Sequence, residues 1–146
     1  INVGANYIFG FPDDTIESME ETLALALELN TEFANVYPCQ ALPGSPLHVR
    51  AQQEGWKLPD SYGGYAFLSY DSEPLPTKHL SAAEVLRFRD DAWQKYFTNP
   101  AYLKLLETKF GKQQRINVEE MSKIKLKRKL LEQTDSAQKS NALTHA

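Results

Sequence analysis

The chain has 146 residues, of which 42% are hydrophobic and 24% are charged, and these fractions are typical of a soluble globular protein. No apolar run approaches the roughly 20 residues that a membrane-spanning helix needs. The single cysteine, Cys39, excludes an internal disulfide and a cysteine-only metal cluster within the chain, and it favours a reducing, cytoplasmic compartment.

Residues 1–30 predict a strand, a tight turn and a helix. β-branched and aromatic residues dominate the strand, which ends at Gly10 and Pro12. Apolar side chains then fall on one face of a helix at Ile16, Met19, Leu23 and Leu27. Asp14 and Glu17 have the spacing of a capping box at its start. Because the sequence begins inside a strand that needs neighbours for its hydrogen bonds, we expect a preceding part of the same protein.

Residues 33–39 predict a second strand, followed by a Gly/Pro turn and a short helix over residues 47–54 that Pro46 opens and Gly55 ends. Strand, helix and strand in this order are the unit of a parallel α/β sheet with a right-handed crossover. Ligands of such sheets bind at the carboxyl ends of the strands. The turns after the two strands are therefore the predicted binding region.

The remaining sequence predicts an aromatic segment and a helical extension. Residues 59–80 lack periodicity, and we expect an ordered irregular segment with a short edge strand at residues 66–70. The helical extension covers residues 81–133, and its three predicted helices begin with capping residues at Ser81, Asn99 and Asn117. Residues 134–146 are polar and small, which predicts a disordered tail.

Two motifs resemble a known family. Residues 6–15 read NYIFGFPDDT, and residues 42–47 read LPGSPL one strand–helix unit later. This pair resembles the second half of a radical SAM domain, whose late strands carry an Ile-x-Gly-Φ-Pro-Gly-(Asp/Glu)-Thr stretch and then a Pro-Gly-Thr-x-Leu turn. The resemblance covers residues 1–58 and implies the C-terminal part of a partial (β/α) barrel of parallel strands. Asn6 and Asp13 depart from the family pattern, where glycine and glutamate stand.

The resemblance implies part of an enzyme that uses SAM and a 4Fe–4S cluster. It is closest to the group often preceded by a cobalamin-binding domain, so cobalamin is a further candidate cofactor. The Cys-x-x-x-Cys-x-x-Cys loop that holds the cluster is absent from this sequence. We therefore expect the cluster on the missing N-terminal part, with no catalytic residue or metal ligand in this chain and no activity from it alone.

Six positions correspond to residues that contact SAM or the small-molecule substrate in the resembled family: Asn6, Ile8, Gly10, Gln40, Ala41 and Leu42. The resemblance implies that Ile8 packs near the adenine and that Gly10 lets the cofactor approach the backbone. Residues 40–42 would line the adenine or substrate side. These side chains would position the cofactor rather than react.

Several of these residues also have a purely structural interpretation. Ile8 and Gly10 fit a buried strand residue and a turn glycine, and helix capping explains Asp13 or Asp14 better than cofactor contact. Cys39 fits a buried strand-end thiol. The three histidines share no ligand spacing, so no zinc site is predicted: His48, His79 and His145.

A basic run supplies the alternative function. Residues 123–131 read KIKLKRKLL, which on a helix over residues 117–133 makes a basic amphipathic surface. The chain would then be a complete small α/β binding module that contacts an acidic partner, RNA or a membrane. No aromatic residues interleave with the lysines, so nucleic acid is not the expected ligand. A solvated helix face near the end of the chain is the structural alternative.

Overall fold

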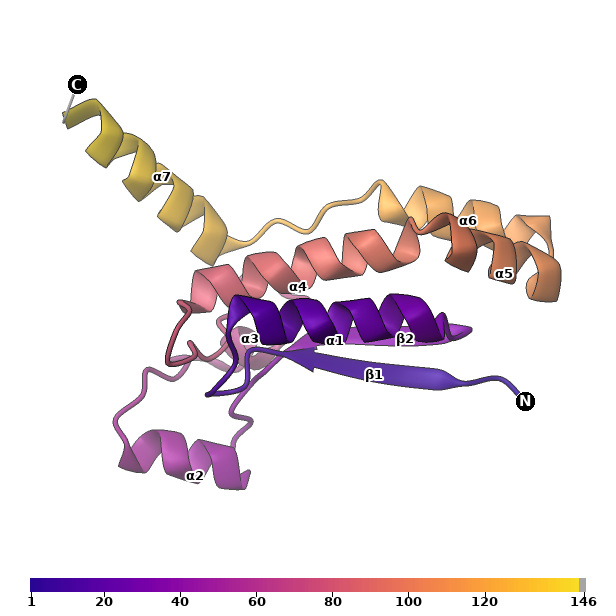
Figure 1. The fold of residues 1–146 in the computed structure, drawn as a ribbon. Helices are drawn as coiled ribbons and strands as arrows, with labels where there is room; N and C mark the ends of the chain where they lie inside the picture. The colour runs from indigo at the N-terminus through magenta and orange to yellow at the C-terminus, as the bar shows by residue number, and fades with distance from the viewer. Residues whose placement is uncertain (145–146) are drawn as a thin grey trace.

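The computed structural model describes residues 1–144 and contains two strands and seven helices in that part of the chain (Figure 1). The elements in chain order are β1 (Gly4–Phe9), α1 (Ile16–Leu29), β2 (Phe33–Pro38), α2 (Pro46–Gln53), α3 (Tyr62–Tyr65), α4 (Ala82–Phe97), α5 (Pro100–Phe110), α6 (Lys112–Ser122) and α7 (Lys129–Thr144). The α/β class and the strand–helix–strand unit predicted for the first 39 residues are confirmed.

β1 and β2 form a parallel two-stranded sheet in the described part of the chain. Gly4 lies opposite Phe33 and Phe9 lies opposite Pro38, so the strands pair along their full length. Helix α1 makes the crossover between them, as the pattern of residues 1–39 predicts. The carboxyl ends of both strands therefore reach the same end of the sheet.

The outer edge of β2 is covered by a side chain. The N–H groups of Phe33 and Cys39 donate to carbonyl oxygens of the first strand segment at 3.1 and 2.7 Å. In a parallel sheet, alternate residues direct their N–H and C=O groups to opposite edges. Phe33 and Cys39 bond to β1, so the N–H and C=O groups of Val36 point away from β1. Arg89, a buried residue of α4, donates its Nε to the Val36 carbonyl at 2.8 Å. This guanidinium satisfies an edge carbonyl that would otherwise lack a partner.

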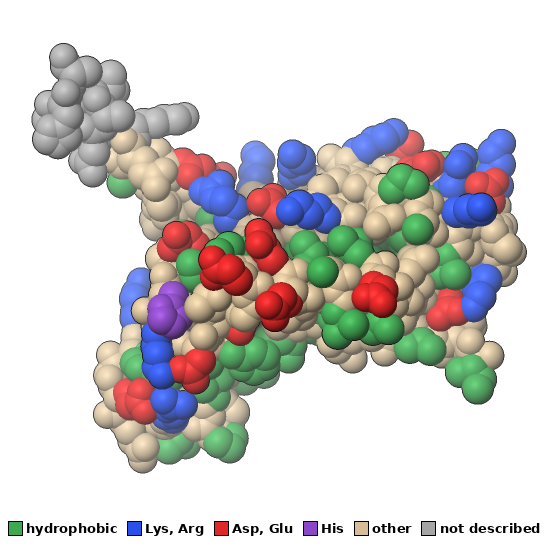
Figure 2. All heavy atoms as spheres, viewed as in Figure 1, with side chains coloured by type: hydrophobic (Ala, Val, Ile, Leu, Met, Phe, Trp, Pro, Cys, Tyr) green, Lys and Arg blue, Asp and Glu red, His purple; other side chains and the backbone are tan. Residues whose placement is uncertain are grey.

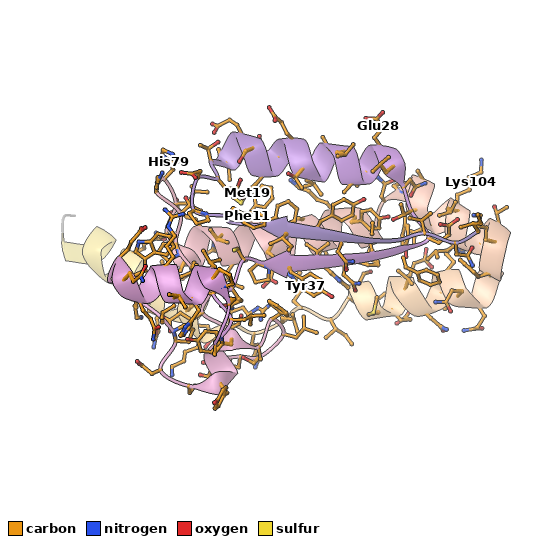
Figure 3. All side chains as sticks on the ribbon, turned by 90° about the horizontal axis from the view of Figure 1, so that it is seen from below. Phe11, Met19, Glu28, Tyr37, His79 and Lys104 are labelled. Atoms are coloured by element: carbon orange, nitrogen blue, oxygen red, sulfur yellow. The ribbon has the colours of Figure 1, made fainter. Side chains whose placement is uncertain are left out.

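The sheet is covered by helices on one face only. Tyr7 and Phe9 of β1 and Val36 of β2 point into the main core. The helical side of that core consists of Met19, Leu23, Ala26, Ala92, Tyr96, Phe97, Tyr102, Leu106 and Val118. Asn6 and Ile8, which alternate with the buried residues, are exposed on the other face. Figure 3 looks onto that open face, with no helix in front of the strands.

Local capping sequences define α4 and α5. The Ser81 side chain accepts from the backbone of Glu84, whose carboxylate in turn accepts from the Ser81 N–H, and this confirms the predicted capping box. Asn99 caps α5, with Pro100 in its first turn, also as predicted. Gly111 ends α5 with a φ of +89°, a conformation that glycine adopts without strain.

The C-terminal third differs from the prediction. The sequence predicts a single helix over residues 117–133, but α6 begins at Lys112 and ends at Ser122, and a non-helical connection over residues 123–128 leads into α7. Glycine at position 111 permits the chain to reverse directly into α6, so Asn117 lies inside a helix rather than at its cap. The basic amphipathic helix predicted there does not form.

Two further predictions differ from the structure. Residues 66–70 form turns rather than an edge strand, and the short helix α3 precedes them. The sequence predicts a disordered tail from residue 134, but α7 continues to Thr144, and residues 145–146 lie outside the described residues. Asp135 of α7 accepts from Arg87 of α4 at 2.6 Å, which fixes this helix against the body in a way that its polar composition does not indicate.

Arg128 ties three parts of the fold together. Its side chain is fully buried, and it binds the Asp90 carboxylate through Nε at 2.9 Å and Nη2 at 2.8 Å. Its Nη1 donates to the carbonyls of Phe67 and Ser69 at 3.0 and 2.9 Å. Asp90 also accepts from Arg89 at 2.8 Å. Helix α4, the aromatic segment and the start of α7 therefore meet at one buried guanidinium.

Glu32 stabilises the amino end of the sheet through its charge. The carboxylate is buried, pairs with Lys109 of α5, and accepts from the Val3 N–H at 2.9 Å. The Lys109 ammonium and then the backbone N–H hold the pKa of Glu32 at about 2, against an ordinary value of 4.5. Because the folded-state pKa is the lower one, this stabilisation is present above pH 4.5 and is lost as the pH falls toward 2.

We expect Glu32→Gln to flatten the dependence of stability on pH below about 4.5, since the neutral amide has no proton to gain. Urea midpoints measured between pH ~6 and pH ~3 check this. Glu28→Gln, a change at an exposed residue of α1, is the matched control and should leave the acid-side slope as in the original chain. A Glu32→Gln slope equal to that of the control would contradict the assignment.

Candidate functional site

The candidate site consists of the open sheet face and the two loops that follow the strands. β1 leads into residues 10–15 and β2 into residues 39–45. Both loops end at a helix N-cap, Thr15 for α1 and Ser45 for α2. The parallel pairing thus brings together the two sequence motifs that suggested a ligand site.

The loop after β1 is closed by Asp14. Its carboxylate accepts from the N–H groups of Gly10 and Phe11 at 2.9 and 2.8 Å, and from the Ser18 hydroxyl at 2.9 Å. The predicted capping box of Asp14 and Glu17 is wrong, because Thr15 caps α1 and Ser18 completes the box. Asp14 instead satisfies the turn that precedes the cap. These two loop N–H groups are therefore already bonded within the protein.

Gly10 is required by the fold itself. Its φ is +88°, and a Cβ built on it would lie 2.3 Å from Cγ1 of Val85 in α4. A contact below 3.0 Å forces a neighbouring atom to move, so a side chain cannot be accommodated here without a shift. The close approach that the glycine permits is to α4, and contact with a cofactor at this position stays a prediction.

The open face of the sheet carries polar and apolar side chains. Asn35 donates its Nδ2 to Oδ1 of Asn6 at 3.0 Å, so the two amides form a pair across the strands. Ile8 is 41% exposed beside them. Tyr37 lies at the carboxyl end and packs against Phe67, with ring centroids 4.8 Å apart. Labelled in Figure 3, it points away from α1.

Sequence reasoning selected Asn6 and Ile8 but missed Asn35 and Tyr37. The same period-two alternation that exposes Asn6 and Ile8 on β1 places Asn35 and Tyr37 on that face of β2. This alternation was readable in the sequence. The resembled motifs cover residues 6–15 and 42–47, so they include Asn6 and Ile8 but no residue of β2.

Gln40, Ala41 and Leu42 differ in how far they are exposed to solvent. Gln40 donates its Nε2 to the Gly64 carbonyl at 3.2 Å, while its Oε1 is buried without a hydrogen-bond partner in the described part of the chain. Ala41 is 1% exposed and packs in a second core cluster with Ala51 and Leu75. Leu42 is 44% exposed. Of the six predicted contacts, Asn6, Ile8 and Leu42 are exposed, while Gly10 and Ala41 are buried.

The remaining reactive residues have structural surroundings. Cys39 is buried, and burial raises the pKa of its thiol to about 11, so the thiolate is scarce at neutral pH. Asp13 is exposed and pairs with Lys78. His48 lies beside the ring of Tyr65. Among the side chains that the structure describes, in residues 1–138, no cluster of three His, Cys, Asp or Glu is arranged to hold a metal ion.

Two hollows lie on other parts of the surface. A groove of about 420 Å³ runs between α4 and the connection over residues 123–128. A smaller, more polar hollow of about 280 Å³ lies between the aromatic segment and the start of α7. Neither is lined by any of the six predicted contact residues. The exposed side chains of Asn6, Ile8 and Leu42 therefore belong to neither hollow.

Comparison with known proteins assigns no family to the chain: no family model, no curated protein and no solved structure matches it. None of the helices in the described residues is both long and apolar enough to cross a membrane.

Proposed function

We propose that this chain forms one wall of a radical SAM enzyme, in which the open face of the β1–β2 sheet lines the pocket for SAM and its substrate. The one-sided sheet is the observation that carries the proposal, since both helices that pack on it, α1 and α4, contribute to the same core. Parallel strands covered by helices on one face only are the wall of a (β/α) barrel, whose other face points inward. The motifs after both strands resemble those of the radical SAM superfamily.

The residues on the open face fit SAM and a polar substrate in part. Ile8 offers exposed apolar surface of the kind on which an adenine ring packs. The Asn6–Asn35 pair makes one mutual hydrogen bond, which leaves amide donors and an acceptor for a ligand. Leu42 adds exposed apolar surface in the loop after β2. Gly10 and Ala41 are buried beneath this face, where Gly10 packs against Val85 of α4 and Ala41 packs with Ala51 and Leu75.

A 4Fe–4S cluster would be held by cysteines on another part of the same protein, because this chain has Cys39 alone and that thiol is buried. When bound, the cluster and SAM supply a 5′-deoxyadenosyl radical. The part of this chain is to orient SAM and the substrate and to exclude competing reactants. Cobalamin stays a prediction of the resemblance, and a cytoplasmic location stays a prediction from the single cysteine.

The test uses the gene product that contains this chain, reconstituted anaerobically with iron and sulfide and reduced with dithionite. We expect it to form 5′-deoxyadenosine from SAM. Ile8→Asp is expected to weaken SAM binding, measured by equilibrium dialysis, by about ten-fold or more, because a carboxylate replaces apolar contact surface. Leu25→Asp, at a residue that is 52% exposed on α1, is the matched control and should leave the affinity unchanged.

Three results would contradict the proposal. The gene could lack a Cys-x-x-x-Cys-x-x-Cys loop in the coding region that precedes this chain. The reconstituted protein could fail to form 5′-deoxyadenosine. Ile8→Asp and Leu25→Asp could bind SAM equally well, which would remove the open face from the pocket.

A further inference from the structure

The connection between α6 and α7 is an exposed stretch with alternating lysine and apolar residues. Residues 123–128 read KIKLKR, and Figure 1 shows them drawn out between the two helices. Ile124 is 70% exposed and Leu126 is 43% exposed, whereas Arg128 is fully buried. The buried arginine holds one end of the stretch against the body, and α6 holds the other.

The backbone of this stretch is open to a partner. The Ile124 N–H donates to the Met121 carbonyl at 3.1 Å, and the Lys129 N–H donates to the Tyr70 carbonyl at 2.9 Å. Between these two bonds, the N–H groups of residues 125–128 have no protein acceptor in the part of the chain that the structure describes. An extended stretch with free N–H groups can pair with a second extended segment, as an exposed sheet edge does.

A groove runs along the same stretch. Its volume of about 420 Å³ lies within the range of small binding pockets. The apolar side chains of its lining are Leu68, Trp93, Met121, Ile124, Leu126 and Leu131. Four of them, Leu68, Met121, Ile124 and Leu126, are exposed, so the groove presents apolar surface that no described residue covers.

The charge around the groove favours an acidic ligand. Lys123, Lys125 and Lys127 are exposed along the stretch. Lys123 pairs with Glu120 at 2.6 Å, while Lys125 and Lys127 have no carboxylate partner in the described residues. Figure 2 shows lysine and arginine side chains standing along the surface over the α6–α7 connection. Of the two acidic residues in the lining, Asp90 is neutralised by two arginines, which leaves Asp91 as the opposing charge.

We propose that residues 123–127 bind an acidic, extended segment of a protein partner, which pairs with the stretch and places an apolar side chain in the groove. A membrane surface fits less well, because N–H groups that enter lipid without acceptors cost several kcal/mol each. RNA fits less well, because no aromatic side chain alternates with the lysines. One acidic peptide can supply backbone carbonyls for the free N–H groups, an apolar side chain for the groove and carboxylates for the lysines.

The test measures binding of fluorescein-labelled peptides of about twelve residues to the whole chain by anisotropy. One set alternates glutamate with leucine, valine or phenylalanine, and a matched set has lysine in place of glutamate. We expect the acidic set to bind and the basic set not to bind, with affinity falling several-fold between about 50 and 300 mM salt. Lys125→Glu/Lys127→Glu should weaken acidic-peptide binding by about ten-fold or more.

Matched variants separate this site from a general charge effect. Lys104→Glu/Lys112→Glu makes the same charge change at exposed lysines of α5 and α6 and should leave binding within about two-fold of the original chain. Ile124→Ser should weaken binding by at least about three-fold, because the groove loses apolar surface. Leu29→Ser, at a residue of α1 that is 57% exposed, is the matched control and should not weaken peptide binding.

Four outcomes overturn the proposal. The acidic and basic peptides could bind equally or not at all. The two double-lysine variants could weaken binding to the same extent. Ile124→Ser could bind as the original chain does. Phosphatidylglycerol vesicles or polyuridine could bind more tightly than every peptide, which would assign the stretch to a membrane or to RNA. None of these outcomes bears on SAM binding, so this site and the proposed function are tested independently.

Discussion

Arg128→Met is expected to lower the free energy of unfolding by about 3 kcal/mol or more. Removing one partner of a buried ion pair leaves the other charge without full compensation, which typically costs about 3–5 kcal/mol. Asp90 would keep only its bond to Arg89. The Phe67 carbonyl would lose its donor, and the Ser69 carbonyl would keep only the Ser72 N–H at 3.3 Å. Urea denaturation at neutral pH measures the change.

Two companion variants locate the cause of that loss. Arg128→Lys keeps the charge but cannot reproduce the two-point contact with Asp90, so it should fall between Met and the original residue. Lys127→Met changes the exposed neighbour and should stay within about 0.5 kcal/mol. Equal stabilities for Arg128→Met and Lys127→Met would show that the buried pair contributes nothing to folding.

Gly10→Ala should destabilise the chain by about 2–4 kcal/mol. An alanine at φ +88° costs about 1 kcal/mol in backbone conformation. Its Cβ would also lie 2.3 Å from Val85, and overpacking of this kind typically costs about 1–3 kcal/mol more. Thermal or urea unfolding of the purified variant provides the measurement.

Gly44→Ala isolates the backbone contribution, since Gly44 has a φ of +85° but no atom lies within 4 Å of the position that a Cβ would take there. It should cost about 1 kcal/mol, with no packing penalty added. Val85→Ala combined with Gly10→Ala should be less destabilising than the sum of the two single changes, because the contact is then relieved. Similar losses for Gly10→Ala and Gly44→Ala would contradict the packing role of Gly10.

Elements that depend on local sequence were predictable. The capping residues Ser81 and Asn99 and the turn glycine Gly111 act within a few residues of their own position, and the helices they bound lie close to the predicted ranges. The predicted cap of α1, Asp14, lies one residue before the actual cap, Thr15. Asp14 and Thr15 are adjacent and have similar capping preferences. Because the Asp14 carboxylate is bonded to the Gly10 N–H in the preceding turn, Thr15 is the residue that caps α1.

The features that escaped prediction depend on distant contacts. Arg128 stands in a run of lysines and has the composition of a surface residue, yet a carboxylate 38 residues earlier in the chain draws it into the interior. Ala41 is buried by Leu75, which belongs to the irregular segment. For the candidate site, Asn6 and Ile8 were selected by the resemblance, while the interpretation from the residues alone made Ile8 a buried strand residue and was wrong, since it is 41% exposed. No local pattern indicated that Gln40, Ala41 and Leu42 would differ in exposure.

The guanidinium of Arg89 occupies the outer edge of β2, and this determines at which edge of the sheet another strand can be added. The Val36 carbonyl on that edge is already bonded, and Pro38, which faces the same way in the alternation, has no N–H to donate. A strand added at this edge would find no free acceptor at the Val36 carbonyl and no N–H donor at Pro38. Addition of a strand is therefore disfavoured at this end of β2 and favoured at the outer edge of β1, to which Gly4, Asn6 and Ile8 direct their backbone groups.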